Sequence, residues 1–201
     1  MGPDYEEESK LIAGGSRVIA GVDEVGRGPL AGPVTAAAVI LDSSNIPPGL
    51  ADSKKLSARK REALAETLAE CAVVSIAHAT VEEIDELNIL QASHLAMCRA
   101  VEGLGQNVDH ALIDGNIIPR DLEIPATALI KGDGRSVSIA AASIVAKVMR
   151  DRIMVDLAQQ HPGYGWEQNA GYPTKAHREA LQNLGVTPHH RRSFKTVHNM
   201  L

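Results

Sequence analysis

The sequence is poor in aromatic residues and in cysteine, and it has no long hydrophobic run. Its 201 residues include one Phe, one Trp, three Tyr and two Cys. Two cysteines are too few for a scaffold of several disulfides. Because Cys71 and Cys98 also lack metal-ligand spacing, we expect buried, reduced thiols. No apolar stretch approaches the roughly 20 residues of a membrane span. We therefore expect a soluble, cytoplasmic protein with one domain large enough to bury a substantial core.

The first 16 residues have no long apolar stretch and include the acidic run Glu6, Glu7 and Glu8. A secretory signal would need a positively charged start followed by an apolar stretch, and this segment has neither. We expect residues 1–16 to form a mobile tail outside the fold. Residues 17–201 should form the domain itself.

Charge is distributed unevenly along the chain. The formal net charge is -5, which at first argues against a nucleic-acid partner. The stretch 173–201 reverses this balance, because it carries a single anion, Glu179, against five cations. These cations are Lys175, Arg178, Arg191, Arg192 and Lys195. The stretch is either an ordinary cationic surface or a contact surface for a polyanion.

The sequence is organised around an apolar run at 18–22 that ends on Asp23 and Glu24. Such a run is typical of a buried strand, and an acid at the end of a stiff strand is held in one place. Two glycines flank Arg27, so the backbone amides there can approach a ligand that a larger residue would exclude. The two carboxylates could bind a metal ion, and the accessible amides and the arginine that follow them could bind a phosphate or a sugar. This combination indicates a site for a polyanion. Taken alone, the same residues are typical of a solvated turn.

The same pattern occurs twice more. A short apolar strand at 110–113 ends on Asp114 and a glycine, and another at 126–130 is followed by Asp133 between two glycines. Binding sites form where the strands of an open α/β sheet end, so three strands that end in acid beside glycine indicate one shared site. Asp151, in a predicted helix, is a reserve candidate for the fourth acid.

The remaining elements follow from periodicity and capping residues. Small and branched residues predict a strand at 33–41, paired antiparallel with the opening strand, and alternation predicts another at 72–79. The predicted helices are 58–70, a short helix from 81, a longer one from 89 to Gly103, 138–160 and 175–184. The residues expected to cap helix starts are Ser57, Thr80, Asn88 and Thr174.

Four further polar side chains have two possible roles each. Lys54 and Lys55 lie in a loop before a predicted helix, where they would be solvated or would contact phosphates. Ser143 and Lys147 are four residues apart on one helix face. This pair would be hydrogen-bonded in place or would grip a phosphate.

Most of the few aromatic residues fall in one short stretch that contains Tyr164, Trp166 and Tyr172. Their clustering predicts a packing lid over the edge of the sheet. Tyr172, at the entrance of the helix 175–184, would be free to touch a ligand.

Six of these segments, in the same order, closely resemble motifs of the ribonuclease HII family, the bacterial type 2 ribonucleases H. The resemblance runs from about residue 18 to residue 194, with no break at the positions that matter. The segments are Asp23-Glu24-Val25-Gly26-Arg27-Gly28, Asp52-Ser53-Lys54-Lys55-Leu56, Ile113-Asp114-Gly115, Lys131-Gly132-Asp133, residues 141–151 and Gly171-Tyr172-Pro173-Thr174. Six linked motifs make the resemblance very specific.

The resemblance implies an α/β, RNase H-like fold. Its mixed five-stranded sheet would be flanked by helices, with three antiparallel strands first, two parallel strands after them, and a small helical extension at about 161–201. The implied activity is that of a metal-dependent endoribonuclease that cuts the RNA strand of RNA–DNA hybrids. It would also cut on the 5′ side of a single ribonucleotide embedded in duplex DNA. The products would carry 3′-hydroxyl and 5′-phosphate ends. The enzyme would act as a monomer and would not bind a membrane.

The resemblance also implies a set of catalytic metal ligands. Asp23, Glu24 and Asp114 would be the central ligands, with Asp133 as the fourth. They would hold two Mg²⁺ or Mn²⁺ ions with substrate bound, and such hard cations prefer oxygen ligands. Crowded carboxylates repel one another, so the empty site should be strained.

In similar enzymes, the backbone around the glycine-flanked arginine hydrogen-bonds the 2′-hydroxyl, the group that separates RNA from DNA. The residue that matches Tyr172 stacks on the neighbouring deoxyribose. The basic C-terminal stretch would hold phosphates, a contact that salt weakens. The substrate-binding residues implied in this way are Gly26, Arg27, Gly28, Lys54, Lys55, Ser143, Lys147 and Tyr172.

Two alternatives belong to different classes of protein. The chain could be a hybrid-binding module without turnover, whose acids merely end strands. It could also be another nuclease or strand-transfer enzyme of the RNase H-like superfamily, which would cut all-DNA substrates as well. A duplex that contains one ribonucleotide, tested with and without divalent metal, separates the enzyme from the binding module, and an all-DNA substrate tests the third hypothesis.

Overall fold

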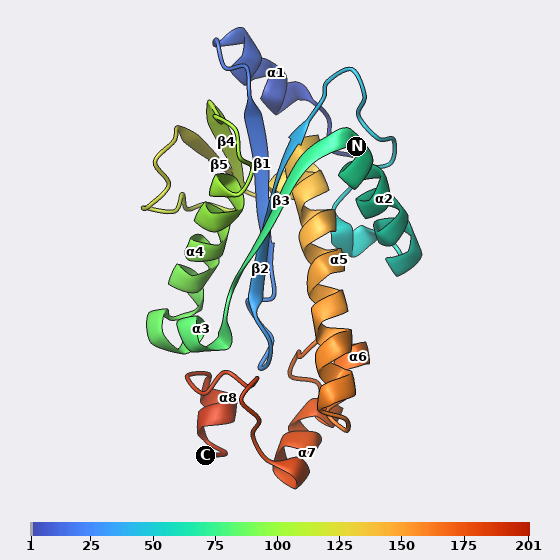
Figure 1. Ribbon diagram of the computed structural model, residues 1–201, viewed down its shortest axis with the longest axis vertical. Coiled ribbons are helices and arrows are strands. Elements are labelled where there is room, and N and C mark those ends of the chain that lie inside the picture. The colour runs from blue at the N-terminus through green and yellow to red at the C-terminus, as the bar shows by residue number, and fades with distance from the viewer. Residues whose placement is uncertain (1) are drawn as a thin grey trace.

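The computed structural model describes residues 2–201, and its centre is a five-stranded sheet. The strands lie in the order β3-β2-β1-β4-β5, so the first strand of the chain stands in the middle (Figure 1). The strands are β1 Ile19–Val25, β2 Val34–Leu41, β3 Ala72–Ala79, β4 His110–Asp114 and β5 Ala126–Leu129. Each of them overlaps a strand predicted from the sequence.

Strand direction divides the sheet into two parts. β1 pairs antiparallel with β2, and β2 pairs antiparallel with β3. β4 runs parallel to β1, and β5 runs parallel to β4. The expected mixed sheet is confirmed. Because β1, β4 and β5 are parallel, their carboxyl ends meet at one edge of the sheet.

Helices cover both faces of the sheet. α2 and α5 pack on one face, and α3 and α4 lie on the other (Figure 1). The helices are α1 Glu6–Ala13, α2 Ala58–Cys71, α3 Val81–Leu87, α4 Ile89–Glu102, α5 Val137–Gln160, α6 Trp166–Asn169, α7 Lys175–Leu184 and α8 Lys195–His198. The predicted N-caps Ser57, Thr80, Asn88 and Thr174 all accept hydrogen bonds from the first turns that follow them.

The β2 strand shows how alternating side chains supply two cores. Ala36 and Ala38 are buried in the cluster that contains α4, whereas Ala37 is buried in the cluster that contains α2 and α5. The beginning of α5 lies directly on β1, where a β-carbon at Gly21 would come within 2.1 Å of the backbone of Ser138. Small residues therefore let α5 support the strand that ends in the two acids.

The N-terminal segment differs from the expected tail outside the fold. Part of it forms α1, and the Glu8 side chain is fully buried. Glu8 Oε1 accepts a hydrogen bond from the Ser136 hydroxyl at 2.5 Å and from the Ser138 N–H at 3.0 Å. The prediction missed this contact because an acidic run resembles a solvated surface. The N–H groups at the start of α5 are unpaired within the helix and therefore favour a carboxylate.

The C-terminal helices α6, α7 and α8 gather at one end of the molecule, beyond the sheet (Figure 1). Tyr164 and Trp166 are 5% and 1% exposed, with stacked rings 5.0 Å apart. They form the core of this extension with Met154 and Leu181, so the predicted lid over the sheet edge is wrong for both. Tyr172 keeps 39% of its surface exposed, as predicted.

The cysteines and the helices can be compared with two expectations from the composition: reduced thiols and the absence of a membrane span. Cys71 and Cys98 are both free; Cys98 is buried and Cys71 is half-buried. α5, with 24 residues, is the longest helix of the described part of the chain. Neither α5 nor any other helix within residues 2–201 has an apolar stretch that could cross a bilayer.

Candidate active site

Three carboxylates lie where β1 and β4 end. Asp23 and Glu24 belong to the last residues of β1, and Asp114 is the last residue of β4. These strands are parallel neighbours in which Val22 pairs with Ile113. The next residues along the two strands are Asp23 and Asp114, so the register brings these two acids side by side.

Asp133 reaches the same edge from a 3₁₀ turn, Gly132–Gly134, that follows β5. The Gly132 N–H donates to Asp114 Oδ1 at 2.7 Å and ties this turn to the end of β4. A β-carbon at Gly132 would come within 2.6 Å of the Ile139 side chain, so the close approach requires glycine. The fold thus gathers all four predicted acids, and we call Asp23, Glu24, Asp114 and Asp133 the carboxylate edge.

The carboxylate edge is crowded with negative charge. Burial and the charges of Glu24 and Asp114 raise the pKa of Asp23 well above its usual value. Burial also raises the pKa of Glu24, although the Arg27 guanidinium opposes this effect. Burial and the charge of Asp114 raise the pKa of Asp133. In the ionised state these groups repel one another in a site with little water.

Cations compensate this charge only in part. Arg27 Nη1 lies 3.4 Å from Glu24 Oε1, and Lys54 Nζ lies 3.9 Å from Asp133 Oδ2. The Lys54 side chain is 84% exposed, and exposed ion pairs contribute about 1 kcal/mol or less. Asp23 Oδ1 accepts a hydrogen bond from the Glu24 N–H at 2.7 Å. The edge therefore keeps an excess of negative charge.

The donor set fits hard divalent cations, which take oxygen ligands and neutralise closely spaced carboxylates. As the side chains stand, no three His, Cys, Asp or Glu residues among residues 2–201 are close enough to hold one ion. A cation bound by several members of the carboxylate edge would draw their oxygens together. Relief of the mutual repulsion would favour that movement.

Two cavities flank the carboxylate edge. One of about 180 Å³ is lined by Glu24, Arg27, Asp114 and Asn116, together with residues of α4 that include His94. The other, of about 580 Å³, includes Asp133 in its lining and carries more cations than carboxylates. Its basic residues are Lys54, Lys55, Lys131 and Arg135. The acids thus lie between a mixed cavity and a cationic one.

Four of these lining residues were not singled out from the sequence: His94, Asn116, Lys131 and Arg135. Lys131 had a signal, because it adjoins Asp133 in one of the six motifs. Its backbone is left-handed, with φ 56°, which is uncommon for a residue other than glycine. His94 and Asn116 had none, since a lone histidine on a helix and an asparagine after a strand are ordinary surface residues.

The glycine-flanked arginine lies beside the carboxylate edge, in the loop between β1 and β2. The Tyr172 ring packs over Gly28, where a β-carbon would stand 3.5 Å from the ring. The Arg27 side chain is 48% exposed. Residues that are far apart in the sequence therefore form one partly open surface next to Glu24, as the resemblance implied.

Ser143 and Lys147 both have hydrogen-bond partners within the protein, which is the first of the two roles that the sequence left open for them. Ser143 is 4% exposed, and its hydroxyl donates to Ser53 Oγ at 2.7 Å. Lys147 Nζ pairs with Asp151 Oδ1 at 2.7 Å. Ser143 therefore supports the turn that carries Lys54 from inside the protein. Asp151, the reserve candidate, is paired within α5 and does not join the carboxylate edge.

The basic C-terminal stretch divides into exposed and buried groups. Arg192 and Lys195 are exposed, whereas Arg191 is fully buried. The expectation of five surface cations is therefore wrong for Arg191, whose guanidinium is occupied by backbone carbonyls. His177 and His190 are also buried, and their Nε2 atoms lie 3.2 Å apart.

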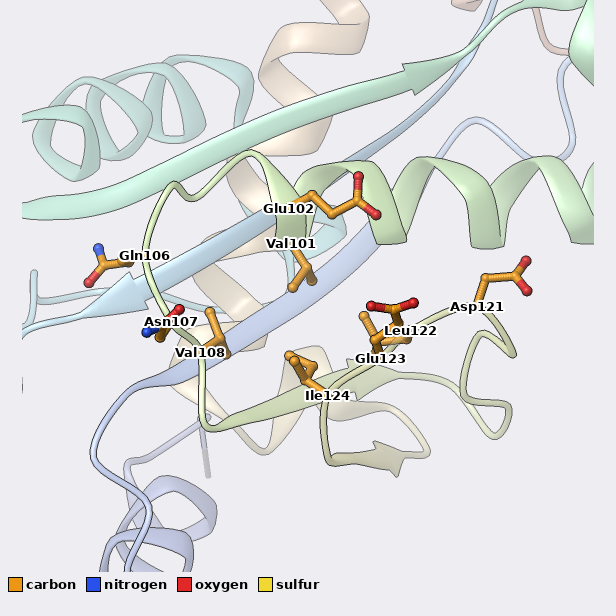
Figure 2. A pocket seen from close by; sticks show the side chains of 9 residues that line it. All are labelled: Val101, Glu102, Gln106, Asn107, Val108, Asp121, Leu122, Glu123 and Ile124. Carbon is orange, nitrogen blue, oxygen red and sulfur yellow. The ribbon is translucent and has the colours of Figure 1, made fainter.

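A further cavity, of about 390 Å³, lies at the carboxyl end of α4 and contains none of the predicted site residues (Figure 2). Its apolar lining comes from Val101, Val108, Leu122 and Ile124. Its polar lining comes from Glu102, Gln106, Asn107, Asp121 and Glu123. Three carboxylates without a basic residue would repel a polyanion, so this cavity is separate from the carboxylate edge in chemistry as well as in position.

Sequence comparison places the same segments in a known family. The chain matches the family model for ribonuclease HII over residues 20–197. It is 72% identical over 199 residues to a ribonuclease HII of Ruegeria pomeroyi, which covers 99% of this chain and 85% of that protein. It is 66% identical over 199 residues to a ribonuclease HII of Paracoccus denitrificans, with 99% and 95% of the two chains covered.

Solved structures agree. The fold is similar to that of the ribonuclease H2 from Pyrococcus horikoshii, with a TM-score of 0.76, 28% identity, and 92% and 97% of the two chains covered. The RNase HII of Archaeoglobus fulgidus, solved in complex with PCNA, gives a TM-score of 0.77 at 30% identity, with 90% and 96% covered. Bst-RNase HIII, solved with Mn²⁺, shares the fold at 20% identity, with a TM-score of 0.75 over 92% of this chain and 70% of that one.

The RNase H-like sheet and the acids at its edge define a metal-dependent endoribonuclease. The chain belongs to the ribonuclease HII family. The resemblance carried by the six motifs is thereby confirmed, together with the RNase H-like fold that it implied.

Proposed function

We propose that this enzyme hydrolyses the RNA strand of RNA–DNA hybrids and cuts on the 5′ side of single ribonucleotides embedded in duplex DNA. The cleavage uses two Mg²⁺ or Mn²⁺ ions and leaves 3′-hydroxyl and 5′-phosphate ends. The observation that carries the proposal is the convergence of four acids on one edge of the sheet, between a basic cavity and the loop of Arg27. The catalytic domain, which includes α1 through the bonds of Glu8 to the start of α5, acts as a monomer.

The carboxylate edge would hold the metal ions. Asp23 and Asp114 lie on adjacent strands and would bind from the sheet, Glu24 from its side, and Asp133 from the 3₁₀ turn. Bound divalent cations lower the pKa of the attacking water and stabilise charge on the scissile phosphate. The protein's own contribution is to hold the four acids on stiff elements and to keep their charges poorly solvated.

The basic cavity would hold the substrate backbone. Lys54, Lys55, Lys131 and Arg135 line it beside Asp133, so a phosphate bound there lies next to the metal ligands. These contacts are independent of sequence and weaken with salt. Ser143 assists indirectly, because its bond to Ser53 fixes the turn that presents the two lysines. Lys147, paired with Asp151, would turn to a phosphate only by leaving that partner.

The loop of Gly26, Arg27 and Gly28 would recognise the ribonucleotide. Its backbone N–H groups would hydrogen-bond the 2′-hydroxyl, the group that DNA lacks. Tyr172, which packs over Gly28 and is 39% exposed, would stack on the neighbouring deoxyribose. Together they would read the junction between one RNA and one DNA sugar.

The test compares three labelled duplexes: DNA with one ribonucleotide, an RNA–DNA hybrid, and all-DNA of the same sequence. Each is incubated with the protein in Mg²⁺, in Mn²⁺ and in EDTA, and the product ends are mapped. We expect cleavage of the first two in either metal, on the 5′ side of the single ribonucleotide, and none in EDTA. Binding without cleavage would support a non-catalytic module, and cutting of all-DNA would support another nuclease of this fold.

A further inference from the structure

Arg150 and Arg191, which we call the arginine pair, are the most deeply buried cations of the described chain, and both are fully inaccessible to solvent. Neither guanidinium takes part in the ion pairs that residues 2–201 form. Burial lowers the pKa of Arg150 to about 10 and that of Arg191 to about 9, so both stay charged at neutral pH. Buried charges without a carboxylate require another source of compensation.

Backbone carbonyls supply that compensation for Arg191. Its Nη2 donates to the carbonyl oxygen of Gly26 at 2.6 Å, its Nη1 to that of Arg27 at 3.0 Å, and its Nε to that of Gly32 at 3.0 Å. The guanidinium also lies 5.1 Å from the centre of the Phe194 ring. Each of its three nitrogens therefore donates to the loop between β1 and β2.

Arg150 holds the other end of the same loop. Its Nη2 donates to the carbonyl oxygen of Ala31 at 3.1 Å and its Nε to that of Pro33 at 3.0 Å. Its Nη1 donates to the carbonyl oxygen of Ala170, next to the segment of Tyr172, at 2.9 Å. One side chain thus joins the loop to the segment that brings Tyr172 over it.

These bonds determine which way the loop presents its N–H groups. In a trans peptide the C=O and the N–H point in opposite directions. The carbonyls of Gly26 and Arg27 point inward to Arg191, so the N–H groups of Arg27 and Gly28, in the same two peptide units, point away from it. No acceptor within residues 2–201 pairs with those two N–H groups. They are left for a ligand.

Gly26 makes this packing possible. Its φ is +94°, a left-handed conformation that favours glycine, and a β-carbon there would lie 2.1 Å from Arg150 Nε. The absence of a side chain at Gly26 thus makes room for Arg150 behind the loop.

We propose that Arg150 and Arg191 are positioning residues for ribonucleotide recognition: they hold the carbonyls of the loop inward so that the N–H groups of Arg27 and Gly28 face the sugar. The inference rests on the proposed function, since it needs the loop to bind a 2′-hydroxyl. It adds the part of the protein that orients the donors. The arginine pair touches neither substrate nor metal ligands.

The experiment uses Arg191→Lys and Arg150→Lys, with Arg152→Lys as the matched control on the exposed face of α5. Lysine keeps the charge but lacks the fork that reaches three carbonyls. For each folded variant, kcat/KM is measured on duplex DNA with one ribonucleotide. The all-DNA duplex is used as a competitive inhibitor in the same assay, and its Ki reports phosphate contacts alone.

We expect kcat/KM to fall about tenfold for both variants, the equivalent of one misplaced hydrogen bond, while Ki stays within about twofold of wild type. Arg152→Lys should change neither value. Unchanged kcat/KM in the folded variants would overturn the proposal, and so would an equal loss in both values. If both lysine variants failed to fold while Arg152→Lys folded, the pair would serve the whole fold and the proposal would also be overturned.

Amide hydrogen exchange of the wild-type protein gives an independent result. The N–H groups of Arg27 and Gly28 should exchange more slowly with the ribonucleotide duplex than with the all-DNA duplex. Equal protection would contradict the proposed orientation. A wild-type protein that does not cut the ribonucleotide duplex would instead contradict the proposed function, so the two failures are distinguishable.

Discussion

Two clusters of ionisable side chains adjoin the loop between β1 and β2: the carboxylate edge, through the ion pair of Glu24 with Arg27, and the arginine pair, through bonds to the loop's carbonyls. The arginine pair is fully buried, whereas the carboxylate edge is partly buried. Each arginine donates to three backbone carbonyls, so its charge is solvated by the protein. The acids accept few hydrogen bonds and have weak cationic partners. Burial and the charges of neighbouring acids raise the pKa of Asp23, Glu24 and Asp133.

The difference separates structural charge from functional charge. A buried cation that donates a hydrogen bond from each of its nitrogens to the backbone holds the chain in place and has no need of a ligand. Buried charges that repel one another are held there by the rest of the fold, at a loss of stability. A ligand of opposite charge relieves that loss, which is why the carboxylate edge and not the arginine pair has the character of a binding site.

The largest effect should come from Asp114→Asn. Asparagine keeps the oxygen that accepts the Gly132 N–H but removes a metal-binding charge, so we expect cleavage to fall about a thousandfold or more. Binding of the ribonucleotide duplex should be retained or improved, because repulsion near the phosphate falls. Single-turnover rates and a binding assay on the same preparation check this. Wild-type turnover would reject Asp114 as a ligand.

Removal of a buried, hydrogen-bonded charge from the arginine pair should lower the stability of the fold. Arg150→Met leaves three buried carbonyls without donors, and we expect a loss of about 3 kcal/mol in the free energy of unfolding. Urea denaturation measures this loss, with the exposed Arg152→Met as the control. A stability equal to wild type would show that the carbonyls find other partners, and the contrast with the carboxylate edge would fail.

Tyr172→Ala tests the open side of the loop. Loss of one stacking platform should lower kcat/KM on the single-ribonucleotide duplex about tenfold. The effect on a continuous RNA–DNA hybrid should be smaller, and thermal stability should change little because the ring is 39% exposed. Unchanged cleavage of the single-ribonucleotide duplex would assign Tyr172 to packing alone.

The buried histidines provide a third case, in which charge is avoided. Burial and the neighbouring histidines, His177, His189 and His161, lower the pKa of His190 to about 3, and its Nδ1 accepts the Thr187 N–H at 3.0 Å. The folded-state pKa lies below the unfolded value of about 6.5. His190 therefore stabilises the fold fully above about pH 6.5, and this contribution is lost as the pH falls towards 3.

The slope should be about 1.4 kcal/mol per pH unit for this one group. Urea denaturation of wild type and His190→Asn between pH 7 and pH 5 measures it, with the exposed His198→Asn as the control. A smaller pH dependence in His190→Asn than in wild type is expected. Parallel curves would show that His190 does not carry it.

The sequence predicted the fold and the carboxylate edge well because both depend on local patterns. Strand periodicity, glycines beside acids, and capping residues such as Thr80 act over a few residues, and the structure follows them. Parallel strands then bring Asp23 and Asp114 together without further information. The six motifs added the family.

The residues that sequence analysis misplaced depend on contacts between distant segments. Arg191 and Glu8 have charged side chains, which are exposed by default, and nothing near them in the sequence indicates burial. Arg191 is buried because three backbone carbonyls of the loop between β1 and β2 accept hydrogen bonds from its guanidinium. The carbonyl of Leu30 in the same loop accepts a bond from its backbone N–H. Glu8 is buried because the start of α5 offers free N–H groups.

The most direct test of the account is the thermal stability of Asp23→Asn in EDTA and in Mn²⁺. If the carboxylate edge carries uncompensated charge that metal relieves, the variant should be more stable than wild type in EDTA, by about 1 kcal/mol or roughly 2–4 °C in Tm. It should also gain less stability than wild type when Mn²⁺ is added. A variant less stable than wild type in EDTA, with an undiminished gain in Mn²⁺, would contradict the account.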